Sequence, residues 1–243
     1  MFPMNDYELK VYDEVTDWKF KMTKRSGMVS RFSKKAQGKI NGLIPEKVHQ
    51  VITESIKAMV KTTLFGSQMT TNQTQAVGIT LKERDDLMRK KTAVFQKTAL
   101  IEGAGTGAGG ILLGLADFPL LLTIKMKFLF EAATIYGFNT NEYEERLFIL
   151  HVFQLAFSSD AVRRETLKNI ENWEERKQAL MEMDWRKFQQ EYRDYIDFAK
   201  MLQLVPGIGA FVGAYANNNL LKHLGETAMN AYRLRILTKA PEL

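Results

Sequence analysis

The amino-acid sequence predicts an all-α protein: a multi-helix single domain with two glycine-rich, closely packed helical segments. Three observations predict this fold class. Apolar residues recur at steps of three and four along most of the chain, helix-capping patterns precede several of these segments, and no segment alternates apolar and polar residues as a half-buried strand does. The 243 residues are 45% hydrophobic and 26% charged, which is the composition of a globular chain long enough to bury a core.

The first two predicted helices are amphipathic. Residues 7–23 carry a single apolar stripe, made of Tyr7, Val11, Val15, Trp18 and Met22. Pro45 opens a second helix, which Gly66 ends. The aligned apolar residues of that helix are Val48, Ile52, Ile56, Met59 and Val60. Residues 67–78 are polar and lack a helical period, and we expect a loop there.

Two further helices are predicted from their caps. Thr80 and Glu83 form a capping box that opens a helix over residues 81–100. Asp117 is the expected N-cap of a strongly apolar helix that ends just before Gly137.

The C-terminal half continues the helical pattern. Asn141 and Glu144 form a predicted capping box for another apolar helix. Residues 160–183 are highly charged with a thin apolar seam, which indicates one surface helix. Residues 185–204 and 226–237 are predicted to form the last two helices.

We divide the chain into a basic N-terminal helical portion, residues 1–44, and a helical core, residues 45–243. Between Lys19 and Ile44 there are eight Lys or Arg and no acidic residue, in a chain of net charge +6. This excess is typical of a segment that meets an anionic partner, nucleic acid or lipid headgroups, and equally of an ordinary solvated basic face. The residues expected to meet a membrane surface are Lys19, Lys21, Lys24, Arg25, Arg31, Phe32, Lys34, Lys35 and Lys39.

Several classes of function are disfavoured. The chain has no cysteine, and its three histidines, His49, His151 and His223, are far apart and outside any zinc-binding motif. We therefore expect neither a metal nor a cofactor. No nucleic-acid-binding signature accompanies the basic charge, so no nucleic acid partner is expected. The N-terminus lacks the apolar region of a secretory signal, which favours the cytoplasm.

The stretch EGAGTGAGG, residues 102–110, contains the spacing G-x-G-x-x-G at Gly105, Gly107 and Gly110. That motif binds dinucleotides when a strand precedes it, whereas a helical pattern precedes it here. The glycines also repeat as small-xxx-small, which lets a second helix approach closely. The residues expected to pack closely or to line a ligand site are Gly103, Gly105, Gly107, Gly109, Gly110, Gly114, Asp117, Pro206, Gly207, Gly209, Gly213, Asn217 and Asn218.

The two glycine patches are poor membrane spans. Asp117 ends the first uncharged run too early, and Pro206 and the triplet Asn217 to Asn219 interrupt the second. A helical core or a buried hairpin is favoured instead, with the asparagines in a polar network at a helix end. Asp117 is only a weak catalytic candidate, because a helix N-cap role explains it better than a polar anchor or acid beside the glycine patch does. Arg233 and Arg235 are expected to form salt bridges or to meet acidic surfaces.

Three blocks of the chain resemble the EcsC protein family. They are DWKFKM with GKINGLIPEKVHQVITESIKAMVKTTLFGS, then GAGTGAGGILLGLADFPLLLTIKMKFLFEAATIYG, then VPGIGAFVGAYANNNLLKHLGETAMNAYRLRIL. The resemblance implies a mainly helical protein whose gene neighbours those of an ABC transporter's ATPase and membrane subunits. It implies no agreed enzymatic activity and no catalytic residues. Some members are associated with membranes or anionic phospholipids, so the resemblance implies a peripheral membrane role.

We therefore expect a non-catalytic, cytoplasmic helical protein, peripheral at the inner face of the membrane. It would bind an anionic lipid surface or serve a membrane (ABC) transporter system. Two alternatives remain open at this point. One is an enzyme acting on a lipid or small amphiphile in a glycine-lined pocket that contains Asp117; the other is a soluble adaptor that binds a membrane-protein subunit.

Overall fold

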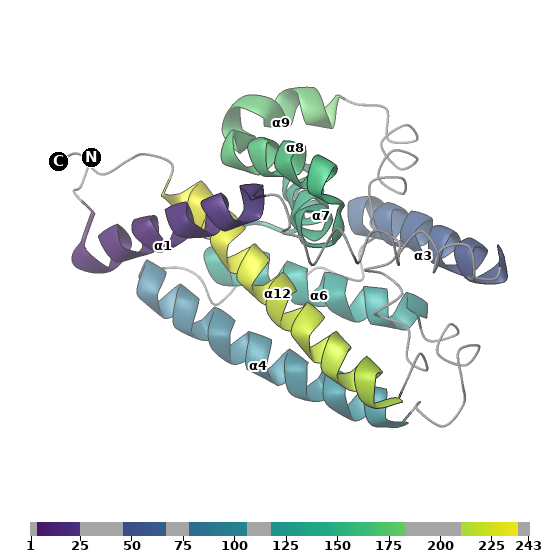
Figure 1. Cartoon of the computed structure of the whole chain (residues 1–243). Helices are drawn as coiled ribbons and strands as arrows, with labels where there is room; N and C mark the ends of the chain where they lie inside the picture. The colour runs from purple at the N-terminus through teal and green to yellow at the C-terminus, as the bar shows by residue number, and fades with distance from the viewer. Residues whose placement is uncertain (1–3, 25–45, 67–77, 106–117, 183–209, 238–243) are drawn as a thin grey trace.

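The computed structural model describes residues 4–24, 46–66, 78–105, 118–182 and 210–237. Over these ranges the chain forms helices and no sheet, which confirms the all-α prediction. The boundary between the predicted portions 1–44 and 45–243 falls outside them. The helices are α1 (Asp6–Thr23), α3 (Glu46–Phe65), α4 (Leu81–Gly105), α6 (Phe118–Tyr136), α7 (Tyr143–Phe157), α8 (Asp160–Glu171), α9 (Trp173–Met181) and α12 (Ala210–Ile236) (Figure 1).

The two N-terminal helices bury the stripes that their sequences predict. In α1 the buried residues are Val11, Val15 and Met22, and they belong to the same core as the rest of the described chain. An unpredicted capping box starts α1, because the Asn5 side chain accepts from the Glu8 N–H at 3.0 Å and the Glu8 carboxylate accepts from the Asn5 N–H at 3.0 Å. In α3 the buried residues include Ile52, Ile56, Met59 and Val60.

The predicted start of α4 and the predicted end of α6 are confirmed by their hydrogen bonds, whereas α4 continues to Gly105, beyond the predicted residue 100. Thr80 and Glu83 form the expected capping box, with the Thr80 N–H donating to the Glu83 carboxylate at 2.7 Å. Gly137 follows the last residue of α6 with φ +90°, a conformation that glycine adopts at little cost. Its N–H donates to the Thr134 carbonyl and the Phe138 N–H donates to the Ala133 carbonyl, which together make a Schellman cap.

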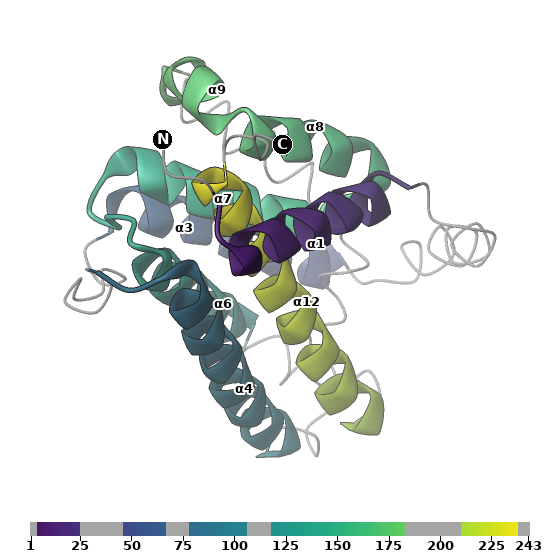
Figure 2. The same cartoon turned by 90° about the vertical axis from the view of Figure 1, so that its left-hand side faces the viewer.

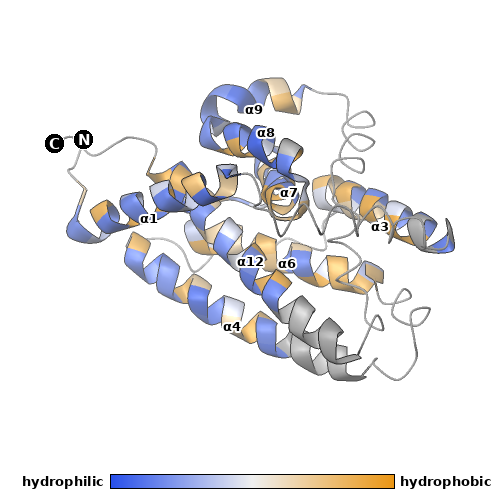
Figure 3. Ribbon diagram, in the orientation of Figure 1, coloured by the Kyte–Doolittle hydropathy of each residue, from blue (hydrophilic) through white to orange (hydrophobic). Residues whose placement is uncertain are grey.

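Helix α7 is the centre of the molecule. From Leu147 to Phe157 every residue is buried, because α7 packs against α3, α6, α8, α9 and α12. Figure 1 shows α7 end-on between these helices, and Figure 3 shows apolar residues on α6 and α7, whereas α8 and α9 are mostly hydrophilic. A helix that is apolar on all sides must be enclosed, so α7 sets the positions of its neighbours.

The predicted capping box of Asn141 and Glu144 is wrong. Helix α7 begins after Glu142, which makes no side-chain cap. The Asn141 N–H instead donates to the Asn139 side chain at 3.0 Å. The Glu144 carboxylate lies 3.1 Å from Lys177 Nζ and 3.4 Å from Arg235 Nη2, so two cations draw it away from the backbone.

The single surface helix predicted over residues 160–183 is wrong as well, because α8 and α9 are separate. The backbone leaves the helical region at Asn172, where φ is −109° and ψ is 38°, and the Asn172 amide donates to the Lys168 carbonyl at 3.0 Å. This break turns Trp173 inward, where it is 1% exposed and packs edge-on against Phe148. Burial of this large ring favours the break over a continuous helix.

Helices α4 and α12 run antiparallel and lie side by side in both views (Figures 1 and 2). At one end Asp85 meets Arg233, and further along Thr92 meets Gly225. A Cβ added at Gly225 would lie 2.8 Å from Thr92 Oγ1 and 2.9 Å from its Cγ2, so the contact requires glycine. Close approach of the two backbones therefore fixes their register.

None of the helices in the described ranges combines the length and the apolar character needed to cross a membrane.

Replacement of Gly225 by alanine should destabilise the fold by about 1–3 kcal/mol, since Thr92 is stiff at χ1 and cannot move aside without strain. At an open helix position the same change would stabilise by about 1 kcal/mol. Urea unfolding measures the difference. The double variant Gly225→Ala, Thr92→Ala should recover most of the loss; a stabilising Gly225→Ala would contradict the close contact.

Candidate functional site

The strongest polar cluster in the described chain surrounds Arg233 and Asp85, which join α12 to α4. Arg233 Nη2 lies 2.7 Å from Asp85 Oδ2, and Arg233 Nε donates to the same carboxylate at 3.0 Å. The side chains are 2% and 0% exposed. A second contact, 3.1 Å from Arg233 Nη1 to Glu14 Oε2, brings α1 to the same arginine.

Two tyrosines complete the environment of Asp85. Tyr136 of α6 donates its hydroxyl to Asp85 Oδ1 at 2.6 Å, and Tyr7 of α1 donates to Oδ2 at 2.7 Å. Burial and the Asp85 charge raise the pKa of Tyr136 well above its ordinary value. Burial lowers the pKa of Arg233, but hydrogen bonds and charge from Asp85 outweigh it and raise the pKa above the ordinary value. The cluster is thus a hydrogen-bonded anchor that joins four helices, α1, α4, α6 and α12.

A second cluster surrounds Arg235 and Glu145, on the other side of the same end of α12. The Glu145 carboxylate accepts from Arg235 Nη1, and it also accepts from the Tyr232 hydroxyl at 2.6 Å. The Arg235 guanidinium lies over the rings of Phe138 and Phe148, 4.0 and 4.5 Å from their centroids. Burial raises the pKa of Glu145 from 4.5 to about 7, and the Arg235 charge limits that rise.

His151 is a core residue and not a metal ligand or a general base. It is 2% exposed, and its Nδ1 lies 2.8 Å from the Leu147 carbonyl oxygen. Its ring meets Trp173 edge-on. Burial lowers the pKa of His151 from 6.5 to about 4, so the ring is neutral at physiological pH. Among the described residues, no three His, Asp or Glu side chains come together as a metal site would need.

A cleft of about 260 Å³ lies between α4 and α12. Its lining combines charged and apolar side chains. Arg89, which borders it, is connected to the Asp85 cluster through Tyr7, whose oxygen lies 3.5 Å from Arg89 Nη2. The lining side chains from both helices are Met88, Arg89, Thr92, Gln96, Lys222, Glu226 and Met229, with Gly225 between them.

The glycine-patch residues predicted from sequence are only partly within the described ranges. Gly103 and Gly105 lie in the last turns of α4, and Gly213 lies near the start of α12. Asn217 and Asn218 lie inside α12, so their predicted place at a helix end is wrong. Outside the described residues lie Gly107, Gly109, Gly110, Gly114, Asp117, Pro206, Gly207 and Gly209.

The predicted membrane-surface residues that are described lie on or just after α1. Lys19 pairs with Glu171 of α8 at 2.9 Å, and Lys24 Nζ lies 4.3 Å from the centroid of the Phe20 ring. Lys21 is exposed, and Phe20 is 61% exposed. Outside the described residues lie Arg25, Arg31, Phe32, Lys34, Lys35 and Lys39.

The prediction that Arg233 and Arg235 form salt bridges is confirmed, but their partners Asp85 and Glu145 were missed. One signal for Asp85 was present in the sequence. Leu81, Asp85 and Met88 are spaced by four and three residues, so the carboxylate falls on the apolar face of α4, and burial of an acid requires a cation.

These observations define the class of protein. It is a helical protein with a single core, with buried arginine–carboxylate anchors and with no sheet in its described part. The family model described as EcsC protein family matches residues 9–237, and the chain belongs to the EcsC family. It is 51% identical to Protein EcsC of Bacillus subtilis (strain 168), over 96% of this chain and 98% of that protein. It is also 33% identical to the uncharacterized protein YdbA of the same organism, over 56% of this chain and 52% of YdbA. No solved structure matches the chain significantly.

Removal of Asp85 should cost about 3–5 kcal/mol of unfolding free energy, because Asp85→Ala leaves the Arg233 charge buried without its main partner. The double variant Asp85→Ala, Arg233→Met should be more stable than Asp85→Ala alone, since it removes the stranded charge. Asp86→Ala is the matched control: Asp86 pairs with Arg89 at the surface, and its loss should cost at most about 1 kcal/mol. Urea unfolding compares the three; equal losses for Asp85→Ala and Asp86→Ala would contradict the anchor.

Two buried groups should give opposing pH dependences. The pKa of Glu145 is raised by folding, so its contribution to stability is full below about pH 4.5 and is lost as pH rises to about 7. The pKa of His151 is lowered by folding, so its contribution is present above about pH 6.5 and is lost as pH falls to about 4.

When one of the two groups is substituted, the pH dependence of stability should therefore be that of the remaining group. Between pH 4.5 and 6.5, the unfolding free energy of Glu145→Gln should rise more with pH than that of the unsubstituted chain. Over the same window, the unfolding free energy of His151→Leu should fall relative to that of the unsubstituted chain. Each difference should amount to about 1–3 kcal/mol. Urea unfolding at several pH values measures both slopes. Curves parallel to that of the unsubstituted chain would show that these groups do not carry the effect.

Proposed function

We propose that this chain is a non-catalytic cytoplasmic protein that binds an anionic membrane surface through an exposed face of α4 and α6. The observation that carries the proposal is the composition of α4 from Leu87 to Lys97. This stretch contains Arg89, Lys90, Lys91 and Lys97 and no acidic residue.

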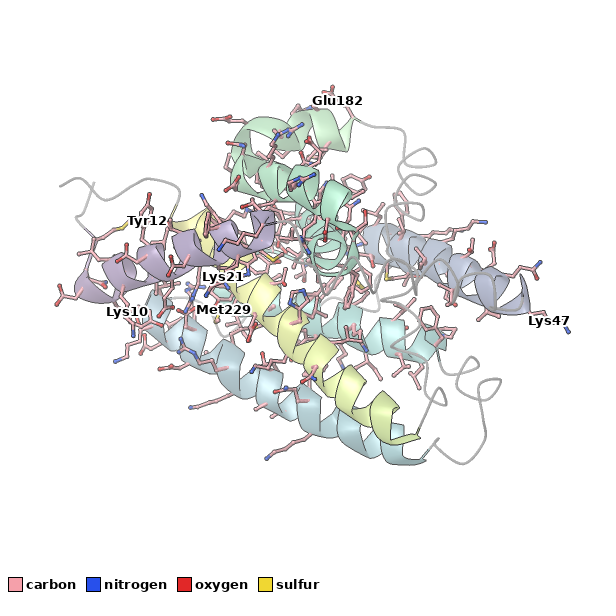
Figure 4. The ribbon with its side chains drawn as sticks, in the orientation of Figure 1. Lys10, Tyr12, Lys21, Lys47, Glu182 and Met229 are labelled. Atoms are coloured by element: carbon pink, nitrogen blue, oxygen red, sulfur yellow. The ribbon has the colours of Figure 1, made fainter. Side chains whose placement is uncertain are left out.

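The exposed residues of that stretch combine charge with apolar surface. Leu87, Lys90, Val94 and Lys97 follow at steps of three, four and three, so they share one side of α4. Leu87 is 37% exposed and Val94 is 57% exposed. Several long side chains that end in nitrogen extend from α4 into solvent in Figure 4. Basic groups beside exposed aliphatic side chains are typical of a helix that lies on a membrane surface.

Helix α6 extends this surface. Lys91 Nζ of α4 lies 2.7 Å from Glu131 Oε2 of α6. Leu120, Ile124, Lys127 and Glu131 follow one another at steps of four, three and four residues. Leu120 and Lys127 therefore lie on the same side of α6 as Glu131. Leu120 is 56% exposed, and Lys127 is exposed. We call the surface formed by Leu87, Lys90, Val94, Lys97, Leu120 and Lys127 the α4–α6 face.

The family resemblance supports a peripheral membrane role, and the lack of a membrane-spanning helix among the described residues is compatible with it. The basic residues that follow α1 would add to the attraction. The enzyme hypothesis depended on Asp117, which lies outside the described residues, and it stays a prediction from the sequence.

Sedimentation with vesicles tests the proposal, at low and high salt and with neutral and anionic lipids. Each Lys on the face should contribute about 1 kcal/mol, so Lys90→Gln with Lys97→Gln should weaken binding to anionic vesicles roughly thirtyfold. The control is Lys168→Gln on α8, on the side of the molecule away from α4 in Figures 1 and 2. It should bind like the unsubstituted chain.

Two results would contradict this proposal. Binding that the double variant leaves unchanged would exclude the α4–α6 face. Binding to neither kind of vesicle, together with co-purification with a membrane-protein subunit, would favour the adaptor role instead.

A further inference from the structure

The N-terminal turns of α6 expose a surface without charge. Residues 118–124 contain no charged side chain, and the exposed side chains among them are those of Pro119, Leu120 and Thr123, which we call the uncharged α6 surface. Leu120 is 56% exposed, and Figure 3 shows this end of α6 as hydrophobic. We propose that the uncharged α6 surface inserts among the acyl chains of an anionic membrane, and that the chain therefore prefers membranes that are loosely packed.

Insertion rests on the proposed membrane role and adds the hydrocarbon region to what the α4–α6 face contacts. Leu120 and Lys127 are seven residues apart, so they lie on the same side of α6, about 10 Å apart along its axis. A bilayer has the matching order of layers, with anionic headgroups above the acyl chains. The long aliphatic stem of Lys127 lets its ammonium group stay at the headgroups while Leu120 lies deeper.

The polar groups of the uncharged α6 surface have their hydrogen bonds within the helix or are absent. Thr123 donates its hydroxyl to the Pro119 carbonyl oxygen at 2.9 Å. Pro119 itself has no backbone N–H. Transfer of an unsatisfied polar group into hydrocarbon is costly, so both features lower the free energy needed to remove this surface from water.

Buried neighbours hold this end of α6 in place. Phe118, Leu121 and Leu122 are all buried and alternate with the exposed residues. They fix the first turns of the helix to the rest of the molecule, so Leu120 is presented by a turn that is already ordered. A surface that is ordered before binding avoids the entropy cost of ordering it on the membrane.

The uncharged α6 surface is short, and for this reason the packing of the lipids matters. Seven helical residues rise about 10 Å, and only one side of them is exposed. A shallow insertion separates the headgroups without crossing the bilayer, and this separation costs less where the acyl chains are loosely packed. Helices that bind at the membrane interface are accordingly sensitive to lipid composition and curvature.

Sedimentation with two kinds of vesicle tests the insertion. Both kinds contain phosphatidylserine and phosphatidylcholine in the same proportion, but one has unsaturated dioleoyl chains and the other has saturated dipalmitoyl chains below their melting temperature. The unsubstituted chain should bind the unsaturated vesicles roughly tenfold more tightly, and Leu120→Gln should lose about that factor and the preference with it. Leu9→Gln is the matched control, because Leu9 is an exposed leucine of α1 between two charged residues, and it should bind like the unsubstituted chain.

A fluorescent label at the same position measures insertion directly. The chain has no cysteine, so Leu120→Cys provides one attachment site for an environment-sensitive fluorophore. Bromine atoms on the acyl chains should quench this fluorophore in the bound chain, and they should quench the same label on Leu9→Cys much less. Thermal unfolding of each variant verifies that the fold is retained, which is expected because both leucines are exposed.

Two results would overturn the insertion: a bound Leu120→Cys label that the bromines do not quench, or a Leu120→Gln variant that binds unsaturated anionic vesicles as the unsubstituted chain does. Binding that weakens in Lys90→Gln with Lys97→Gln but not in Leu120→Gln would retain the proposed membrane role and remove the insertion. Binding that depends on Leu120 but not on the two lysines would support the insertion and contradict the electrostatic role of the α4–α6 face. Binding to neither kind of vesicle would overturn both.

Discussion

The ion pair between Arg233 and Asp85 is the interaction on which the arrangement of the helices depends. A buried charge without a partner is costly, so neither residue can occupy its place unless α4 and α12 meet at this point. Glu14 and the two tyrosines that share the pair extend the requirement to α1 and α6. A buried ion pair contributes little net stability compared with apolar packing, and its value here lies in excluding other arrangements of the same helices.

The second arginine follows from the geometry of the helix. Residues two apart on an α-helix point to nearly opposite sides, so Arg233 reaches α4 and α1 while Arg235 reaches α7 and α9. One turn of α12 therefore joins two groups of helices. The same register, continued along α4 and α12, places Thr92 against Gly225 and opens the cleft beside them. It also predicts that Gly103 lies opposite the turn of α12 that contains Gly213, as the small-residue spacing of both segments favours.

Local features of the fold were predictable from the sequence, and long-range ones were not. The box of Thr80 and Glu83 and the glycine after α6 depend on hydrogen bonds within a few residues, and both were predicted correctly. The start of α7 was mispredicted because Glu144 is held by cations far along the chain. The break at Asn172 depends on a place in the core for Trp173, which no local pattern reveals. The cleft was missed for the same reason: its residues are ordinary helix-surface side chains until two distant helices align.

Helix α4 connects the fold to the proposed membrane surface because its three sides differ. One side, with Leu81, Asp85 and Met88, is buried; a second carries Lys90, Val94 and Lys97 to solvent; and a third borders α12 with Arg89. The Tyr7 hydroxyl of α1 contacts both Arg89 and Asp85. Hydrogen bonds therefore connect the cleft to the buried pair of Asp85 and Arg233 and to α1.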